Sequence, residues 1–217
     1  PNGFIAVALA AALFIAAGLE AFVGFLLLIG IGLFVGFPAL GANVGAAITL
    51  FIAAGLWWVV RTRRRVGVRE VAFVGGVVAL GLAAVLLANR YLADVPTHAG
   101  RFVEQAEGLP GVTSAVWHRL GIGFGQLNAV PAAYLAMLLL FVTVWLVRKR
   151  PKPFDRGLAL AGERWADAIL VLSLSSIVAF FVNDTGVAAA TPGVLYAAAA
   201  LAYPAFVASE GTVEEHV

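Results

Sequence analysis

The first apolar segment of the chain limits its fold more than any other feature. Residues 3–36 are apolar except for Glu20. A single helix over this segment would be about 51 Å long at 1.5 Å per residue, whereas the hydrocarbon core of a bilayer is about 30 Å thick. Two short helices, over residues 3–19 and 21–36 with Glu20 at the bend, fit that thickness better. The alternative is one tilted span preceded by an interfacial piece.

Further apolar segments predict more membrane spans. They cover residues near 44–60, 71–89, 132–147, 165–182 and 187–207. Only 12% of the residues are charged, against roughly 25% in soluble domains. The sequence therefore predicts an all-α fold, a polytopic transmembrane helix bundle of about seven spans, or six if residues 3–36 cross once. We expect one membrane domain over residues 1–217, and Trp57 and Trp58 in an interfacial aromatic belt.

The chain begins with Pro1, and its first apolar segment lacks the basic flank of a signal peptide, so we expect a piece of a longer protein. The absence of cysteine excludes disulfides, iron–sulfur clusters and thiol catalysis. No nucleotide-binding loop, zinc-protease motif or hydrolase elbow occurs, so no cofactor is predicted. Whether the protein is an enzyme stays open.

Two short loops rich in basic residues set the expected orientation. Each holds five: Arg61, Arg63, Arg64, Arg65 and Arg69 in the loop 61–70, and Arg148, Lys149, Arg150, Lys152 and Arg156 in the loop 148–156. The positive-inside rule places both loops, and the tail 208–217, on the cytoplasmic side of a cell membrane. We expect anionic lipids to contact Arg61, Arg63, Arg64 and Arg65, and no nucleic acid to bind. The loop 90–131, expected to be partly helical, then lies outside.

Two interruptions of apolar segments share this expected external side. GFPALGANVG at 36–45 contains Asn43, and NDTG at 183–186 contains Asn183 and Asp184. The segment at 36–45 can be a turn with closely packed glycines, and NDTG can be a turn that caps the next helix. Alternatively, either segment can form the wall of a substrate site. Broken helices at membrane depth line the binding sites of many transporters, and acids within the membrane are costly enough to suggest function.

The external loop holds a further candidate pair. His98 and Arg101 are three residues apart, so a helix would place them side by side, where Arg101 can hold a phosphate or carboxylate. No metal pattern is present. A solvated external face is the alternative. Residues 113–130 predict an amphipathic helix capped by Thr113 or Ser114.

On the expected cytoplasmic side, GERWADA at 162–168 predicts an anchor. Arg164 and Asp167 are spaced to pair on one helix face. Farther along the same span, Ser173, Ser176 and Phe180 share a face that leads toward Asp184. This face is either a polar track or a set of serines bonded to their own helix.

Four short motifs occur in order: GANVG at 41–45, THAGR at 97–101, HRL at 118–120 and NDTG at 183–186. In this order the chain, from about Gly36 to Gly186, resembles the C-terminal membrane region of large bacterial envelope proteins of unestablished function. Some proteins of that group carry an extracytoplasmic domain resembling the alkaline phosphatase superfamily. The resemblance implies membership in a larger envelope protein.

Three functions remain open. The chain is expected to transport or handle a lipid-linked or anionic envelope component through Asn43, His98, Arg101, Asn183 and Asp184. The first alternative is a structural anchor or complex subunit without chemistry. The second is the membrane module of an extracytoplasmic phosphate-ester enzyme.

Overall fold

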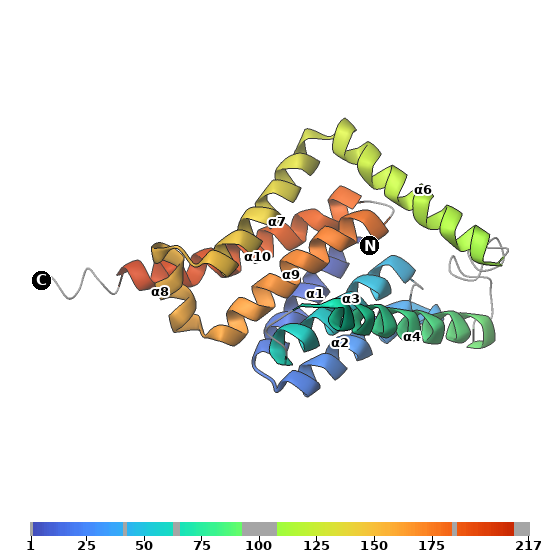
Figure 1. Cartoon of the computed structure of the whole chain (residues 1–217), viewed down its shortest axis with the longest axis horizontal. Coiled ribbons are helices and arrows are strands. Elements are labelled where there is room, and N and C mark those ends of the chain that lie inside the picture. The colour runs from blue at the N-terminus through green and yellow to red at the C-terminus, as the bar shows by residue number, and fades with distance from the viewer. Residues whose placement is uncertain (1, 41–42, 63–65, 93–107, 184–185, 211–217) are drawn as a thin grey trace, which may run out of the picture.

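The structure, a computed structural model, describes residues 2–40, 43–62, 66–92, 108–183 and 186–210. These residues are helical apart from short connections (Figure 1). In chain order the elements are α1 (Asn2–Ala17), α2 (Ala21–Gly36), the 3-10 turn η1 (Pro38–Leu40), α3 (Val44–Thr62), α4 (Val68–Leu92), α6 (Gly108–Ala129), α7 (Pro131–Lys149), α8 (Lys152–Ala161), α9 (Glu163–Val182) and α10 (Gly186–Glu210). The all-α prediction is therefore confirmed for the described residues.

Residues 3–36 form two helices, as the better-fitting alternative required. α1 ends at Ala17 and α2 begins at Ala21. Between them Glu20 adopts an extended backbone conformation, with φ −66° and ψ 153°, which breaks the helix. The structure thus shows two helices here, and whether one or both of them cross the membrane stays a prediction.

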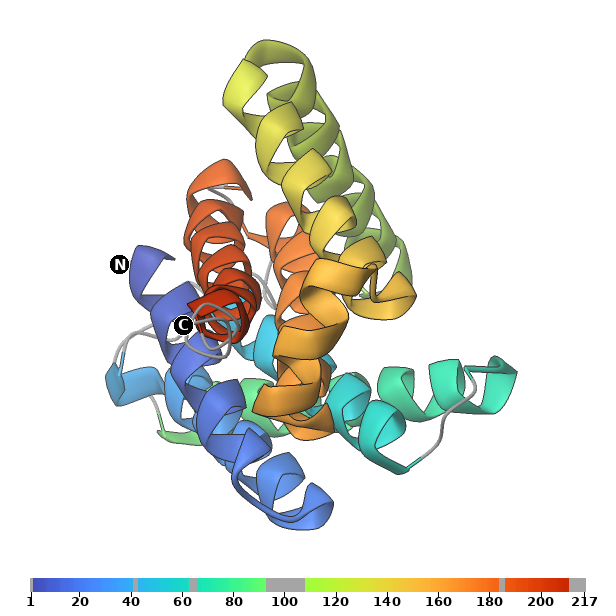
Figure 2. The same cartoon turned by 90° about the vertical axis from the view of Figure 1, so that its left-hand side faces the viewer.

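α9 is the central helix of the bundle. It packs against α1, α3, α6, α7, α8 and α10, and Figure 1 shows it lying between α1, α3, α7 and α10. In its most apolar window 61% of the residues are buried, whereas the corresponding share of α4 is 11%. Figure 2 shows α4 running along the edge of the bundle and α6 and α7 rising above it, and Figure 1 shows that these two helices meet at one end and diverge from there. The middle of α9, including Ser173, Ser175 and Ser176, is thus enclosed by protein, whereas most of α4 faces outward.

Close packing of α2, α3 and α4 depends on glycines that receive aromatic rings. Phe51 of α3 is fully buried, with one ring edge against Gly32 of α2 and the other against Gly81 of α4. Trp57 is also fully buried, lies against Gly24, and donates a hydrogen bond from Nε1 to the Ala21 carbonyl at 3.2 Å. The prediction that Trp57 belongs to an interfacial belt is wrong, because α2 approaches α3 closely enough to cover the indole.

Four helices in the described part are long and apolar enough to cross a membrane, namely α3, α4, α7 and α9, and α1 and α2 are shorter apolar helices. Apolar side chains such as Leu80 on α4 and Leu138 on α7 are more than half exposed. These features agree with a helical bundle embedded in a membrane.

Three segment boundaries differ from expectation. α8 fills much of the expected loop 148–156 and continues to Ala161, because Leu158 packs into the core while Asp155 and Arg156 stay exposed. α6 begins at Gly108, so Thr113 and Ser114 lie inside the helix and do not cap it. α10 extends to Glu210, into the expected tail.

Candidate functional site

Polar side chains gather at two opposite ends of the bundle. We call the first the amide end, which comprises Asn43, Thr49, Asn89 and Asn183. We call the second the ionic end, which comprises Glu20, Arg61, Arg150, Glu163, Arg164 and Asp167. α3 and α9 run antiparallel between them, since the start of α3 contacts the end of α9 and Arg61 near the end of α3 contacts Asp167 near the start of α9.

At the amide end the two predicted interruptions meet. The Asn183 side chain closes α9 and lies directly against Gly45, where an added Cβ would stand 2.5 Å from Asn183 Oδ1. Asn183 Nδ2 also donates to Thr49 Oγ1 at 3.5 Å, across 134 residues of sequence, and to the Ala179 carbonyl at 3.0 Å. Gly45 of GANVG and Asn183 of NDTG therefore lie against each other in the fold.

Asn43 caps α3. Its Oδ1 accepts a hydrogen bond from the Ala46 backbone N–H at 2.9 Å, and its own backbone N–H donates to the Val35 carbonyl at 3.3 Å. An amide that accepts from the first turn satisfies a donor that the helix itself leaves open. Asn43 thus ties the start of α3 to the end of α2.

Asn89 was missed by the sequence analysis. It is buried on α4, and its Nδ2 donates to the Gly36 carbonyl at 3.1 Å and to the Val85 carbonyl at 2.8 Å. Gly36 is the last residue of α2, and its carbonyl accepts no hydrogen bond within the helix, so the Asn89 amide supplies the donor that it needs. A single amide in an otherwise apolar helix was the signal available in the sequence.

The remaining predicted site residues, His98, Arg101 and Asp184, lie outside the described residues, as do Arg63, Arg64 and Arg65. The proposed polar track on α9 is tightly packed where it is described. Ser173 Oγ donates to its own helix at the Ile169 carbonyl, 2.8 Å away, and Ser176 presses against Gly193 of α10. Phe180 is fully buried in the same face. The serines therefore serve close helix packing.

At the ionic end, three ion pairs converge on the first two turns of α9. Asp167 Oδ2 accepts from Arg61 Nη1 of α3 at 3.0 Å. Arg164 Nη2 donates to Glu20 Oε1 at the α1–α2 bend, at 3.1 Å. The expected pair between Arg164 and Asp167 is wrong, because Glu20 of the α1–α2 bend binds Arg164 and Arg61 of α3 binds Asp167.

The third pair joins the end of α7 to α9. Arg150 has a left-handed backbone conformation, φ 47° and ψ 60°, which ends α7. Its guanidinium binds both carboxylate oxygens of Glu163, at 2.7 and 2.6 Å. The hydrogen bond to Glu163 raises the pKa of Arg150, so this side chain stays charged.

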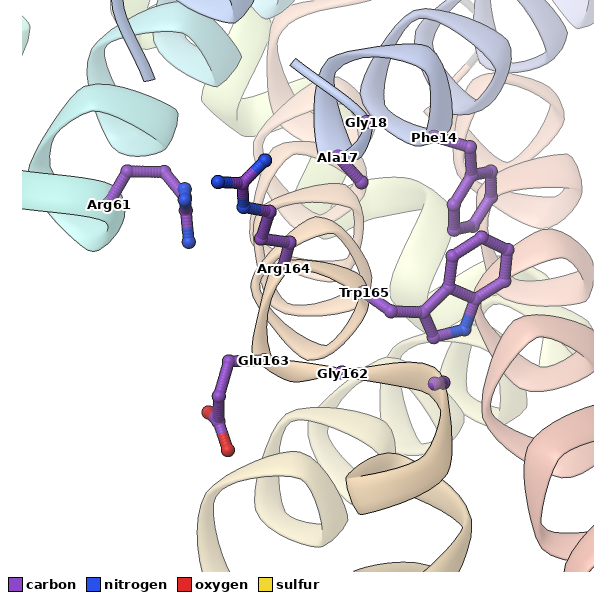
Figure 3. Close-up of a pocket in the computed structure, with 9 residues that line it drawn as sticks. Phe14, Ala17, Gly18, Arg61, Gly162, Glu163, Arg164 and Trp165 are labelled. Carbon is purple, nitrogen blue, oxygen red and sulfur yellow. The ribbon is translucent and has the colours of Figure 1, made fainter. Parts of the chain in front are cut away.

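An open pocket of about 660 Å³ lies at the ionic end. Its lining comprises Phe14, Ala17, Gly18, Arg61, Ala161, Gly162, Glu163, Arg164 and Trp165 (Figure 3). Phe14 and Trp165 stack with ring centroids 4.5 Å apart and form one wall. Figure 3 shows the Arg61 and Arg164 side chains extending toward each other from α3 and α9, while Glu163 points away. The pocket thus joins an aromatic wall to a pair of guanidinium groups.

Among the described residues no group of three or more His, Asp or Glu side chains is arranged to hold a metal ion. Comparison with protein-family models, curated proteins and solved structures finds no significant match to this chain. The function must therefore be argued from the two polar ends.

Proposed function

We propose that this chain is a membrane domain of a bacterial envelope protein that transports or handles an anionic or lipid-linked component at its amide end. The observation that carries the proposal is the contact between Gly45 and the Asn183 side chain. It joins two interruptions of apolar helices from distant parts of the sequence. Such interruptions are tolerated at membrane depth against protein or a water-filled cavity, and transporters bind substrates there.

The charge distribution supports an orientation of the two ends relative to the membrane. The ionic end carries Arg61 and Arg150, which belong to the two loops rich in basic residues, and the amide end lies opposite. Under the positive-inside rule the ionic end faces the cytoplasm and the amide end faces outward. Asp184 directly follows Asn183 in the sequence.

A structural anchor is the second candidate, and the hydrogen bonding favours it. Asn43 and Asn89 bond to helix-terminal backbone groups, and Asn183 bonds to Thr49 and to its own helix. Side chains held in this way stabilise helix ends without any substrate. The two candidates differ in whether a vesicle containing the protein moves lipid.

Transport can be tested with the full chain reconstituted in phosphatidylcholine vesicles that contain a fluorescent phosphatidylglycerol. A membrane-impermeant reductant reports lipid that reaches the outer leaflet. We expect the native chain to speed this exchange, and Asn183→Ala and Asp184→Asn to slow it by about tenfold, as expected for loss of one hydrogen bond of about 1.4 kcal/mol.

Ser173→Ala is the matched control. It removes a buried hydroxyl from α9 that donates to the Ile169 carbonyl of the same helix, so exchange should be unchanged. If the native chain exchanges lipid no faster than empty vesicles, the transport proposal fails. If, in addition, the asparagine and aspartate variants lower only the melting temperature, the chain is an anchor.

A further inference from the structure

We infer that the pocket at the ionic end binds the phosphate headgroup of an anionic membrane lipid, with Arg61 and Arg164 as the phosphate ligands. This site is separate from the amide end and lies at the other end of α9. A volume of about 660 Å³ is in the range of small-molecule sites.

Arg61 is the buried member of the pair and is held in position from two sides. Its guanidinium lies 5.6 Å from the centre of the Trp57 ring, and one nitrogen binds Asp167. Its Nε is buried and has no hydrogen-bond partner within the part of the chain that the structure describes. A buried donor without a partner costs free energy, and a phosphate oxygen would relieve that cost.

Arg164 is the accessible member of the pair. Its side chain is 44% exposed, and that of its partner Glu20 is 78% exposed. Exposed ion pairs contribute little to stability, so a lipid phosphate can replace Glu20 at small cost. Arginine suits this role because its planar guanidinium can give two parallel hydrogen bonds to phosphate.

The aromatic wall argues for a lipid over a free phosphate ion. Trp165 donates from Nε1 to the Ala200 carbonyl at 2.9 Å, which fixes the ring that stacks on Phe14. Ala17, Gly18 and Ala161 continue this apolar lining. A soluble phosphate would leave the wall without a contact, whereas the glycerol and upper acyl carbons of a lipid would cover it.

The surroundings place the pocket where such a headgroup lies. α8 ends at the pocket rim, and it exposes Asp155 and Arg156 while Leu158 packs into the protein core. Arg61 and Arg150 at this end belong to the loops 61–70 and 148–156, which together contain ten basic residues. Basic residues close to a bilayer concentrate anionic lipids there.

The test uses the full chain in nanodiscs of phosphatidylcholine with phosphatidylglycerol, followed by native mass spectrometry of retained lipid. We expect one phosphatidylglycerol retained in preference to phosphatidylcholine. Arg164→Gln should lower that retention about tenfold, since it removes a charge-assisted hydrogen bond. Its matched control is Arg90→Gln, an exposed residue in the last turn of α4 that makes the same charge change away from the pocket and from both basic loops.

A second pair of variants fills space without changing charge. Ala161→Trp places a large ring at the pocket lining and should also abolish retention, whereas Ala159→Trp, exposed on the same helix, should not. Far-UV circular dichroism confirms that each variant is folded. Equal retention in all four variants, or equal loss in the pocket variants and their controls, overturns the site.

Glycerol 3-phosphate distinguishes the two sources of phosphate. Added at the same concentration as the lipid, it should not displace phosphatidylglycerol, because it lacks the chains that cover the aromatic wall. Displacement at equal concentration would show a site for soluble phosphate and would overturn the assignment to a lipid.

Discussion

Phe51 offers the sharpest test of how the helices of this bundle are spaced. An alanine Cβ at position 81 would lie 2.7 to 2.8 Å from three atoms of the Phe51 ring. Contacting carbon atoms normally lie about 3.5–4.0 Å apart, so either the ring or α4 must move by about 1 Å. The ring cannot move freely, because Gly32 supports its opposite edge, where a Cβ would lie 2.7 Å from Cε1.

The expected cost follows from comparing two substitutions on the same helix. Overpacking a core by one methyl group costs about 1–3 kcal/mol, while replacing glycine by alanine in a helix contributes about 1 kcal/mol of stability. Gly76 lies on α4 with no neighbouring atom within 4 Å of an added Cβ. Gly76→Ala should therefore stabilise the protein, and Gly81→Ala should be less stable than Gly76→Ala by about 1–3 kcal/mol.

Reversible unfolding in mixed detergent micelles, followed by far-UV circular dichroism, measures both free energies. A double-mutant cycle with Phe51→Ala then tests the cause. Without the ring, Gly81→Ala should lose its penalty and behave like Gly76→Ala. Our account of the packing would be refuted if the two glycine variants were equally stable, or if the Gly81→Ala penalty persisted in the Phe51→Ala background.

Three further predictions concern the two ends of the bundle. Gly45→Ala brings a Cβ within 2.5 Å of the Asn183 side chain. It should lower the free energy of unfolding by about 1–3 kcal/mol in the same assay. An unchanged free energy of unfolding would contradict the contact between α3 and α9. Asp167→Asn leaves Arg61 without its carboxylate and should lower stability by about 1–2 kcal/mol, near the lower end of the range for a hydrogen bond to a charged group. The added Arg61→Gln change should recover part of this loss; additive losses would contradict the ion pair. Because the chain contains no cysteine, Lys152→Cys and Ser114→Cys can be labelled singly with an impermeant thiol reagent in intact cells, and only Ser114→Cys should react. Labelling of Lys152→Cys alone would reverse the expected orientation.

The positions of most of the apolar helices could be predicted from the sequence. The spans expected at 44–60 and 165–182 became α3 over Val44–Thr62 and α9 over Glu163–Val182. Glu20 marked the break between α1 and α2. These boundaries can be read locally, because a backbone in an apolar surrounding must satisfy its own hydrogen bonds, and charged or turn-forming residues end the segments that can do so.

α8 is the exception that shows the limit of local reading. Its first turn is charged, so the sequence does not indicate an apolar helix. The opposite face of α8 packs on the core, where Gly157 lies against the backbone of Pro204 and Ala205 in α10. The mean hydropathy of this segment is low, so the sequence analysis predicted a loop there. Only the position of α10 makes this face buried.

The tertiary structure alone decided which side chains meet. Arg61 pairs with Asp167 across 106 residues, although Arg164 is closer in sequence, and Trp57 is buried although it stands near a helix end. The structure also brings Gly45 against Asn183. From the sequence, the two segments could be expected only on the same side of the membrane. The physical reason is that lipid tails and neighbouring helices are equally apolar, so hydropathy cannot tell a lipid-facing residue from one that packs on protein.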